Sequence, residues 1–449
     1  MAFVSLLIPQ MDSGMKEKYT GNKTELPLGS ASILTHLKQN GVDVRFNDFD
    51  FSGDLEEVLE GCDIVGINAN AERRENAIIL AEKVKQLIPS VKVVLGGTYI
   101  SAEGGNGAPS MAEIVVENYP FIDYIVVGPG ELGLFYLLNN QAPSKIISQA
   151  IHLNDLPTTD ISLVNPENYF EAYREKNSSL GFKGVIPVLS GRGCFKAAIK
   201  GRCGFCSIPN VEEYTRKDIR DFWKEIEYYE SVYGGGYIYS DKCDTFTQSL
   251  KWLKEVSKAK RSGLNVHLRG YERIDNLADE RIVELLASLG FKQLQIGIDS
   301  ADPHIINKMN KEIKSNQIGR AVINLKNHKI YPVFSVIYGF PGETIGSAQR
   351  TLDVVKFIDV ELDGQFDIYA SPCIPYPGTK LYYGAYRGEL GSTAEEIVKG
   401  NFCYSIPKLI QETIPRTTDL TCEEVVGFVR KTFQFGRAKT DFSKSFGSE

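Results

Sequence analysis

The sequence lacks any long apolar segment. None of its 449 residues lies in a run approaching the ~18 consecutive apolar residues that a membrane helix needs. The N-terminal apolar run is short and has no basic flank, unlike a signal peptide, and low-complexity tracts and internal repeats are absent. These absences predict a globular cytoplasmic protein, with no membrane partner, whose thiols stay reduced.

The sequence is also short of positive charge and of cysteine. Lysine and arginine number 50 against 57 acidic residues, and the net charge of -7 argues against a general nucleic-acid binder. Only eight residues are cysteine, yet three of them, Cys194, Cys203 and Cys206, share the stretch "SGRGCFKAAIKGRCGFCSIPN". In a reducing compartment such clustering indicates a metal site or catalysis rather than disulfides.

The spacing of apolar residues predicts an α/β protein in four parts. Apolar runs alternate with helical patterns over residues 1–145, which predicts a doubly wound, flavodoxin-like parallel sheet. Residues 146–185 are rich in proline and asparagine and are predicted to be a linker. Six further strand–helix units over 186–385 predict a partial (β/α)6 TIM-like barrel, followed by a mainly helical region over 386–449.

The three cysteines follow the first predicted barrel strand, where barrel enzymes build their active sites. Three thiolates on one loop suit zinc or an iron–sulfur cluster. A closed zinc site needs a fourth ligand, for which Cys243 is the nearest candidate. A four-iron cluster held by three cysteines keeps one iron open for a substrate. Four cations of the loop either offset the cluster's charge or face solvent: Arg192, Lys196, Lys200 and Arg202.

The motifs resemble those of one enzyme superfamily. "RGC" followed by "CGFC", with Phe205 before the last cysteine, resembles the cluster motif of the radical S-adenosylmethionine (radical SAM) superfamily. "GFKQLQIGIDSADPHIINKMNK", "YGFPGET" and "SPCIPYPGTKLY" resemble the fourth, fifth and sixth strand segments of its cobalamin-binding branch. "DIVGINA", "KVVLGG" and "IDYIVVGPGE" are similar to the cobalamin-binding module of that branch, so the resemblance spans residues 1 to about 385.

The sequence departs from the family pattern in three places. Eight residues, rather than the common three, separate Cys194 from Cys203. Pro129 stands where the first domain usually has glutamate, and Asp299 stands where the fourth strand usually ends in glutamate. The sequence also lacks a DxHxxG motif, as this branch often does, so no histidine is placed to bind cobalt from below.

The resemblance implies cofactors and residues for them. Cys194, Cys203 and Cys206 would hold a 4Fe–4S cluster whose open iron binds S-adenosylmethionine and cleaves it to a 5′-deoxyadenosyl radical. Residues implied to bind S-adenosylmethionine are Phe205, Ser240, Asp241, Arg269, Arg273, Asp299, Gly339 and Glu343. Residues implied to line a cobalamin site are Asn68, Gly96, Gly97, Thr98, Gly128, Gly130 and Glu131, although strand-end glycines also occur in ordinary turns.

The reaction and the substrate stay open at this point. The resemblance implies attack on an unactivated carbon, by methyl transfer or by cyclisation or rearrangement. It also implies a small-molecule or peptide substrate and an electron donor such as flavodoxin or ferredoxin. One alternative is a radical SAM enzyme with an empty or repurposed first domain, and another is an iron–sulfur or zinc sensor. Catalytic candidates facing the substrate are Tyr239, Tyr271, Tyr338, Lys196 and Lys200.

The long spacing between Cys194 and Cys203 makes a prediction of its own. Both thiols must reach one cluster, so the eight residues 195–202 have to fold back. "FKAAIK" has good helix propensity, and Gly201 offers a stop. We therefore expect a short helix that forms a wall of the active site, with Lys196 and Lys200 on one face. A surface insertion without function is the alternative.

Overall fold

The protein is described by a computed structural model covering residues 2–12, 24–105, 107–139, 141–142, 144–149, 151–177, 181–208 and 214–437. The chain divides into two compact units, each of which contains segments distant in sequence. The first unit comprises Met1–Pro187, Ser207–Thr215 and Gly400–Tyr404, and the second comprises Val188–Cys206, Arg216–Lys399 and Ser405–Glu449.

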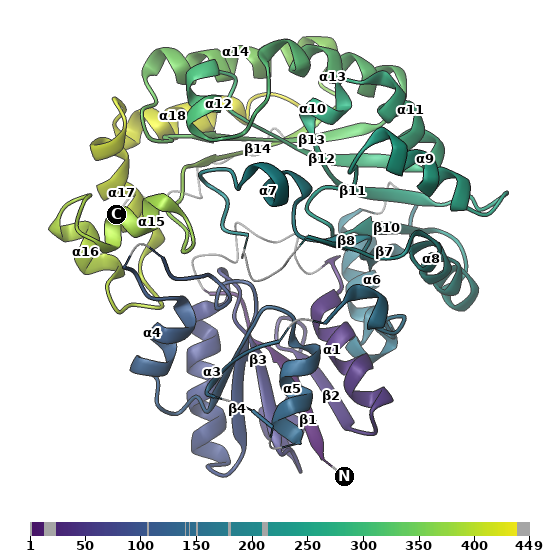
Figure 1. Ribbon diagram of the computed structural model, residues 1–449, viewed down its shortest axis with the longest axis vertical. Coiled ribbons are helices and arrows are strands. Elements are labelled where there is room, and N and C mark those ends of the chain that lie inside the picture. The colour runs from purple at the N-terminus through teal and green to yellow at the C-terminus, as the bar shows by residue number, and fades with distance from the viewer. Residues whose placement is uncertain are drawn as a thin grey trace. The chain divides into compact units, whose positions relative to one another are not determined.

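The first unit contains a parallel sheet flanked by helices, as the sequence predicted (Figure 1). The strand order β2-β1-β3-β4-β5-β6 reverses at β1. The strands are β1 (Phe3–Ile8), β2 (Asp43–Asp48), β3 (Ile64–Asn68), β4 (Lys92–Gly96), β5 (Tyr124–Val127) and β6 (Ile146–Ser148). The helices are α1 (Leu28–Gln39), α2 (Leu55–Leu59), α3 (Arg74–Leu87), α4 (Met111–Asn118), α5 (Gly130–Leu138) and α6 (Pro166–Lys176).

Residues 146–185 have more regular structure than a linker. Within this range, β6 pairs with β5 and adds an edge strand to the sheet. Helix α6 is fixed to the same unit because the Tyr169 hydroxyl donates to Asp48 at 2.7 Å. The segment Gly400–Tyr404 also joins this unit: Phe402 is fully buried and its ring lies 5.2 Å from that of Tyr99. Composition alone could not show these contacts between distant segments.

The six predicted barrel strands form one sheet, in the order β14-β13-β12-β11-β10-β7. All of these strands lie in the second unit except β7, most of which is assigned to the first. The strands are β7 (Gly184–Val188), β10 (Tyr237–Asp241), β11 (His267–Arg273), β12 (Phe291–Asp299), β13 (Tyr331–Tyr338) and β14 (Asp367–Pro372). The helices between them are α7 (Phe195–Lys200), α8 (Ile219–Tyr233), α9 (Leu250–Ala259), α10 (Ile274–Leu277), α11 (Glu280–Leu289), α12 (Pro303–Lys308), α13 (Ser315–Asn327) and α14 (Ile345–Glu361).

The two faces of this sheet differ in what covers them. Figure 1 shows α9, α11, α13 and α14 along the convex side of the sheet and α7 on the concave side. In β12 the apolar residues Leu294, Ile296 and Ile298 are fully buried, and Gln293 and Gln295 between them are half-buried. Side chains alternate between the faces of a strand. The apolar set therefore packs under the helices, and the polar set faces the concave side.

The C-terminal region is helical as predicted over its described part. Its helices are α15 (Lys380–Tyr386), α16 (Ser392–Val398), α17 (Ile406–Thr417) and α18 (Cys422–Thr432). Helix α18 packs on β13, where the ring of Phe428 stacks on Tyr338 with centroids 5.5 Å apart. The hydroxyls of Tyr338 and Thr432 lie 2.9 Å apart, and Tyr338 is fully buried.

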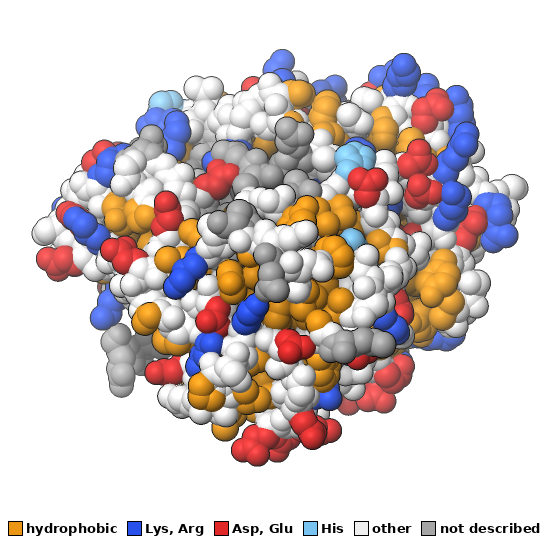
Figure 2. All heavy atoms as spheres, turned by 60° about the horizontal axis from the view of Figure 1, so that its bottom comes forward, with side chains coloured by type: hydrophobic (Ala, Val, Ile, Leu, Met, Phe, Trp, Pro, Cys, Tyr) orange, Lys and Arg blue, Asp and Glu red, His pale blue; other side chains and the backbone are white. Residues whose placement is uncertain are grey.

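None of the described helices has the length and apolar character needed to cross a membrane. On the face shown in Figure 2, acidic and basic side chains are intermingled. The absence of one large basic field on this face is consistent with the net charge of -7.

We expect Tyr338→Phe to lower the free energy of unfolding by about 1 kcal/mol, because it removes a buried hydroxyl and leaves Thr432 with one partner fewer. Guanidinium unfolding of the full chain measures the change. Tyr228→Phe is the matched control, because Tyr228 is 42% exposed on α8. Equal losses in the two variants would contradict the packing of α18 on β13.

Candidate active site

The cysteine loop begins directly after β7 and folds as the sequence predicted. Cys194 is the N-cap of α7, and Gly201 ends that helix with a φ of 79°. A side chain is strained at that φ, which explains the glycine. Beyond it, the amide of Cys206 donates to the carbonyl of Cys203 at 3.0 Å and closes a tight turn. The five extra residues are thus taken up by the short helix α7.

The three thiols are half-buried and free of disulfides. Cys194 Sγ lies 3.7 Å from Thr245 Oγ1, and Lys196 Nζ lies 4.0 Å from Cys203 Sγ. Burial raises the pKa of the Cys203 thiol, while the charges of Lys311 and Lys196 oppose that rise. Accessible thiols beside cations are suited to bind a metal as thiolates.

The other cysteines differ in surroundings. Cys243 is fully buried, its Sγ donates to the carbonyl of Thr245 at 3.4 Å, and burial raises its pKa to about 12. Cys373 is 2% exposed, as expected for a packing residue. Cys62 is half-buried, and its Sγ donates to the carbonyl of Val58.

The donor set fits a cluster better than zinc. Among the residues that the structure describes, no three His, Cys, Asp or Glu side chains converge on a point that could hold one metal ion. A closed zinc site needs four ligands around one ion. An iron–sulfur cluster takes one thiolate per iron, so its cysteines do not have to converge on one point. Three cysteine thiols on one loop meet that requirement.

A second cationic segment, which sequence reasoning missed, adjoins the loop. Lys311 is 8% exposed, forms an ion pair with Asp299, and its Nζ lies 5.9 Å from the ring centroid of Phe205. Burial alone would lower the pKa of Lys311, but the charges of Asp299 and Cys203 raise it. Sequence offered no signal for this lysine, because its local pattern is that of an exposed loop residue.

Asp299 and Arg273 take partners near the same loop. Asp299 has a φ of 63°, at an irregularity in the pairing of β12 with β13. Arg273 Nη2 donates to the carbonyl of Lys311 at 2.7 Å, and its Nε lies 3.0 Å from Asp275. The predicted roles of both residues toward S-adenosylmethionine stay predictions. Their positions bring them to the edge of the sheet that holds the cysteines.

Side chains tie the end of β10 to the segment after β7 and to β11. Both oxygens of Asp241 accept from Ser190, at 2.7 Å from the amide and 2.8 Å from the hydroxyl. Asp241 is fully buried, which raises its pKa to about 6. Ser240 Oγ accepts from Arg269 Nε at 3.0 Å. Asp241 therefore anchors the residue at which the cysteine loop begins.

The segment from Gly339 to Glu343, whose two end residues are predicted to bind S-adenosylmethionine, packs on the C-terminal helices. Glu343 is fully buried: its Oε2 accepts from the amide of Gly339, and its Oε1 has no partner among the described residues. Burial raises the pKa of Glu343 to about 7. The amide of Gly342 donates to Thr417 at 2.6 Å, which fixes this loop to α17.

Phe205 contributes to an apolar cluster beside the cysteines. It packs against Ile305, Met309, Phe340 and Cys373, all of which are buried. Such a cluster excludes water from one side of the loop. The predicted role of Phe205 toward S-adenosylmethionine stays a prediction.

Two of the three tyrosines proposed to face the substrate point elsewhere. Tyr239 is fully buried, and its hydroxyl donates to Glu230 of α8 at 2.7 Å. Tyr338 is buried under α18 as described above. Tyr271 is half-buried and alternates with buried neighbours along β11. Gln295 lies opposite Tyr271 in β12. The alternation of apolar and polar residues in "FKQLQIGID" could have indicated Gln295 as a further candidate to face the substrate.

The two lysines of α7 do not share an environment, contrary to the expectation. Lys196 is 6% exposed and is turned into the protein, whereas Lys200 has an exposed side chain 2.7 Å from Glu312. Packing, not helical spacing, decided their directions.

The predicted cobalamin residues do collect at the carboxyl edge of the first sheet. Gly97 has a φ of 120°, and a Cβ there would lie 3.0 Å from the backbone of Ala69. The backbone conformation and this close contact require glycine at position 97 even when no ligand is considered. Thr98 Oγ1 donates to Asn70 at 2.9 Å. Gly96 ends β4 with no close contact, since its Cβ would lie 3.7 Å from the nearest atom.

The remaining residues at this edge suggest room for a ligand. Asn68 Oδ1 is buried without a partner among the described residues. A Cβ at Gly128 would meet nothing within 4 Å, whereas one at Gly130 would collide with Ile33. Glu131 is buried and accepts from Ser32 at 2.7 Å. An unsatisfied acceptor and open backbone at the same edge of the sheet fit a ligand rich in amide groups, so this edge fits cobalamin.

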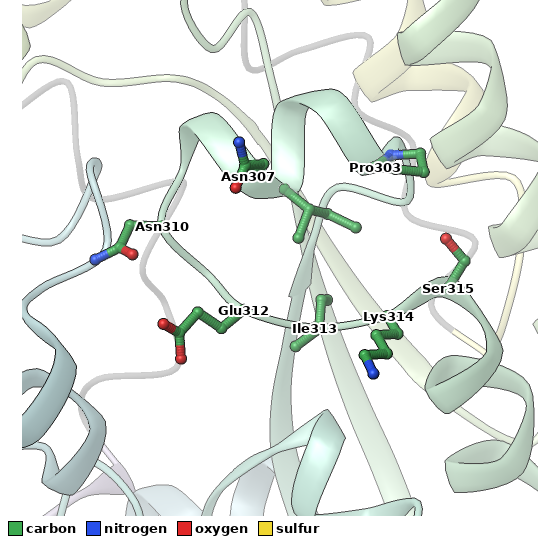
Figure 3. A pocket seen from close by; sticks show the side chains of 8 residues that line it. Pro303, Asn307, Asn310, Glu312, Ile313, Lys314 and Ser315 are labelled. Carbon is green, nitrogen blue, oxygen red and sulfur yellow. The ribbon is translucent and has the colours of Figure 1, made fainter.

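A pocket of about 460 Å³ lies between α12 and the start of α13 (Figure 3). Its lining includes Asn307, Asn310, Glu312 and Lys314. None of the residues predicted from sequence to bind a cofactor lines it.

The chain is similar to known proteins over most of its length. It is 26% identical to an uncharacterized methyltransferase of Pyrococcus horikoshii, over 86% of this chain and 84% of that protein. It is 24% identical to the anaerobic magnesium-protoporphyrin IX monomethyl ester cyclase of Rubrivivax gelatinosus, over 85% of this chain and 70% of that protein.

The fold also matches a solved structure. The radical S-adenosylmethionine methyltransferase TsrM of Kitasatospora setae, solved with cobalamin and a 4Fe–4S cluster, superposes with a TM-score of 0.64 at 16% identity, covering 86% of this chain and 76% of that one. Residues 189–355 match the Radical SAM superfamily. The chain therefore carries a radical SAM domain and has the fold of a cobalamin-dependent radical SAM enzyme.

Proposed function

We propose that this enzyme is a cobalamin-dependent radical SAM methyltransferase. The observation that carries the proposal is the loop after β7, which places the half-buried thiols of Cys194, Cys203 and Cys206 near buried cations. This loop lies within the segment that matches the Radical SAM superfamily. A sensor would not need the complete six-stranded sheet around it.

The chain's own residues hold and shield the reacting groups. Cys194, Cys203 and Cys206 would hold a 4Fe–4S cluster, which when bound supplies the electron that cleaves S-adenosylmethionine. Arg269, oriented by Ser240, offers a guanidinium fork of the kind that binds a carboxylate. The apolar cluster of Phe205, with its neighbours Met309 and Phe340, excludes water beside the cysteines.

The first unit would bind cobalamin at the carboxyl edge of its sheet, as doubly wound sheets bind ligands. Asn68 Oδ1 would accept a hydrogen bond from an amide of the corrin side chains, and Gly128 would leave room for the ring. When bound, cobalamin supplies the methyl group for transfer. No histidine of the chain is placed in a DxHxxG motif, so we propose binding without a histidine below the cobalt.

Methyl transfer is preferred to cyclisation as the reaction. The Pyrococcus horikoshii relative and TsrM are methyltransferases by name, whereas the Rubrivivax gelatinosus relative is a cyclase. Incubation of the reduced protein with hydroxocobalamin and S-adenosylmethionine deuterated in its methyl group tests the choice. We expect labelled methylcobalamin, detected by mass spectrometry. Bound corrinoid that stays unlabelled would contradict methyl transfer.

We predict that changing Cys194, Cys203 and Cys206 together to alanine abolishes binding of about four irons per chain. Iron and sulfide analysis after anaerobic reconstitution measures the loss. The matched control changes Cys62, Cys403 and Cys422, which are also half-buried. Full iron in the first variant would refute the assignment of the ligands.

We predict that the reconstituted wild-type chain, reduced with dithionite, forms 5′-deoxyadenosine from S-adenosylmethionine, whereas the cluster-free variant does not. Chromatography of the quenched reaction measures the product. A wild-type protein with a full cluster that forms none would count against radical chemistry.

We predict that Asn68→Leu weakens retention of hydroxocobalamin, because it removes the unsatisfied acceptor without adding bulk. Gly97→Trp should abolish retention, through collision with Ala69 as well as with the ligand. The visible spectrum after gel filtration measures bound corrinoid. Gly29→Trp is the control, because its position on α1 is open. Full retention in Asn68→Leu and Gly97→Trp would show that the site lies elsewhere.

A further inference from the structure

Lys196 is a buried cation beside one of the cysteines. Its side chain belongs to α7, the helix that takes up the five extra residues between Cys194 and Cys203. Its ammonium donates to the carbonyl of Gly201 at 2.9 Å and to the carbonyl of Asn310, and it lies 4.0 Å from Cys203 Sγ. The residue is 6% exposed.

The charge of Lys196 has no carboxylate partner within the described part of the chain. The other lysines nearby do: Lys311 pairs with Asp299, and Lys200 pairs with Glu312. A buried charge without an opposite charge is costly. Two carbonyl oxygens and the more distant charge of Glu312 relieve part of that cost. The group at Cys203, 4.0 Å away, is a further neighbour that can carry negative charge.

The segment after α12 fixes the ammonium at this place. Asn310 Nδ2 donates to the carbonyl of Arg202 at 3.0 Å, and Figure 3 shows this side chain directed away from α13. The amide of Gly204 donates to the carbonyl of Met309 at 2.8 Å. Hydrogen bonds thus join the cysteine loop to the segment after α12 on both sides of Cys203. They restrain the ammonium of Lys196 close to the Cys203 thiol.

We propose that Lys196 is a positioning residue that tunes the midpoint potential of the cluster held by Cys203. The inference rests on the proposed function, because it requires the cluster. Reduction adds one electron, supplied by a one-electron donor of the flavodoxin or ferredoxin class, and so adds one negative charge. A fixed positive charge stabilises the reduced form more than the oxidised form. Lys196 therefore raises the potential and makes reduction easier.

The experiment compares four variants of the full chain after anaerobic reconstitution. Lys196→Met removes the charge at similar length, Lys196→Gln keeps a hydrogen-bond donor without charge, and Lys196→Arg keeps the charge. Lys200→Met, on the exposed side of the same helix, is the control. Iron content is measured first, and a dithionite titration followed by electron paramagnetic resonance then gives the midpoint potential.

We expect Lys196→Met and Lys196→Gln to bind iron and to shift the potential to more negative values, with Lys196→Arg and Lys200→Met close to wild type. If both neutral variants lose iron while Lys196→Arg keeps it, the charge is still shown to be required. A neutral variant with full iron and an unchanged potential overturns the proposal. Loss of iron in Lys196→Arg as well also overturns it, because shape rather than charge would then matter.

Failure of the proposed function is distinguishable from failure of this inference. A wild-type chain that forms no cluster refutes the proposed function before any variant is compared. A wild-type chain with a redox-active cluster whose potential does not depend on residue 196 refutes only the role of Lys196.

Discussion

The site depends on how the cysteine loop is held in place. A loop with eight residues between two cysteines could place them far apart, yet here α7 takes up the excess and Gly201 reverses the chain. The segment at Met309 and Asn310 then accepts and donates hydrogen bonds on both sides of Cys203. These hydrogen bonds offset the conformational entropy that the chain loses when the loop closes.

Around this loop, polar residues at the strand ends satisfy one another. Asp241 binds Ser190, and Asp299 binds Lys311. Residues with buried polar groups must find partners, so these pairs hold the edge of the sheet rigid. Glu343 Oε1 is one buried atom at this edge that has no hydrogen-bond partner among the described residues. Its raised pKa, to about 7, follows from the same burial.

The C-terminal helices α17 and α18 pack against the second unit and form part of it. Helix α18 covers Tyr338, and α17 fixes the loop at Gly342. The segment around Phe402, by contrast, packs in the first unit. One stretch of chain after the barrel therefore stabilises both units, which a reading of local patterns could not foresee.

The sequence by itself determined the order and type of most elements. Helix α1 and the strands of both sheets follow from apolar periodicity, and the helix α7 with its stop at Gly201 follows from local propensity, because these signals act within a few residues. It also determined the three cysteines as a candidate metal site, because their shared loop is a local feature.

Only the tertiary structure decided where side chains point. Tyr239 and Tyr338 end up under helices, Lys196 is turned inward while Lys200 faces solvent, and Lys311 joins the site from a distant segment. The sequence pattern likewise did not predict the edge strand β6 or the packing of Phe402 in the first unit. Each depends on contacts between residues far apart in the chain, and the free energy of such contacts is not encoded in any local pattern.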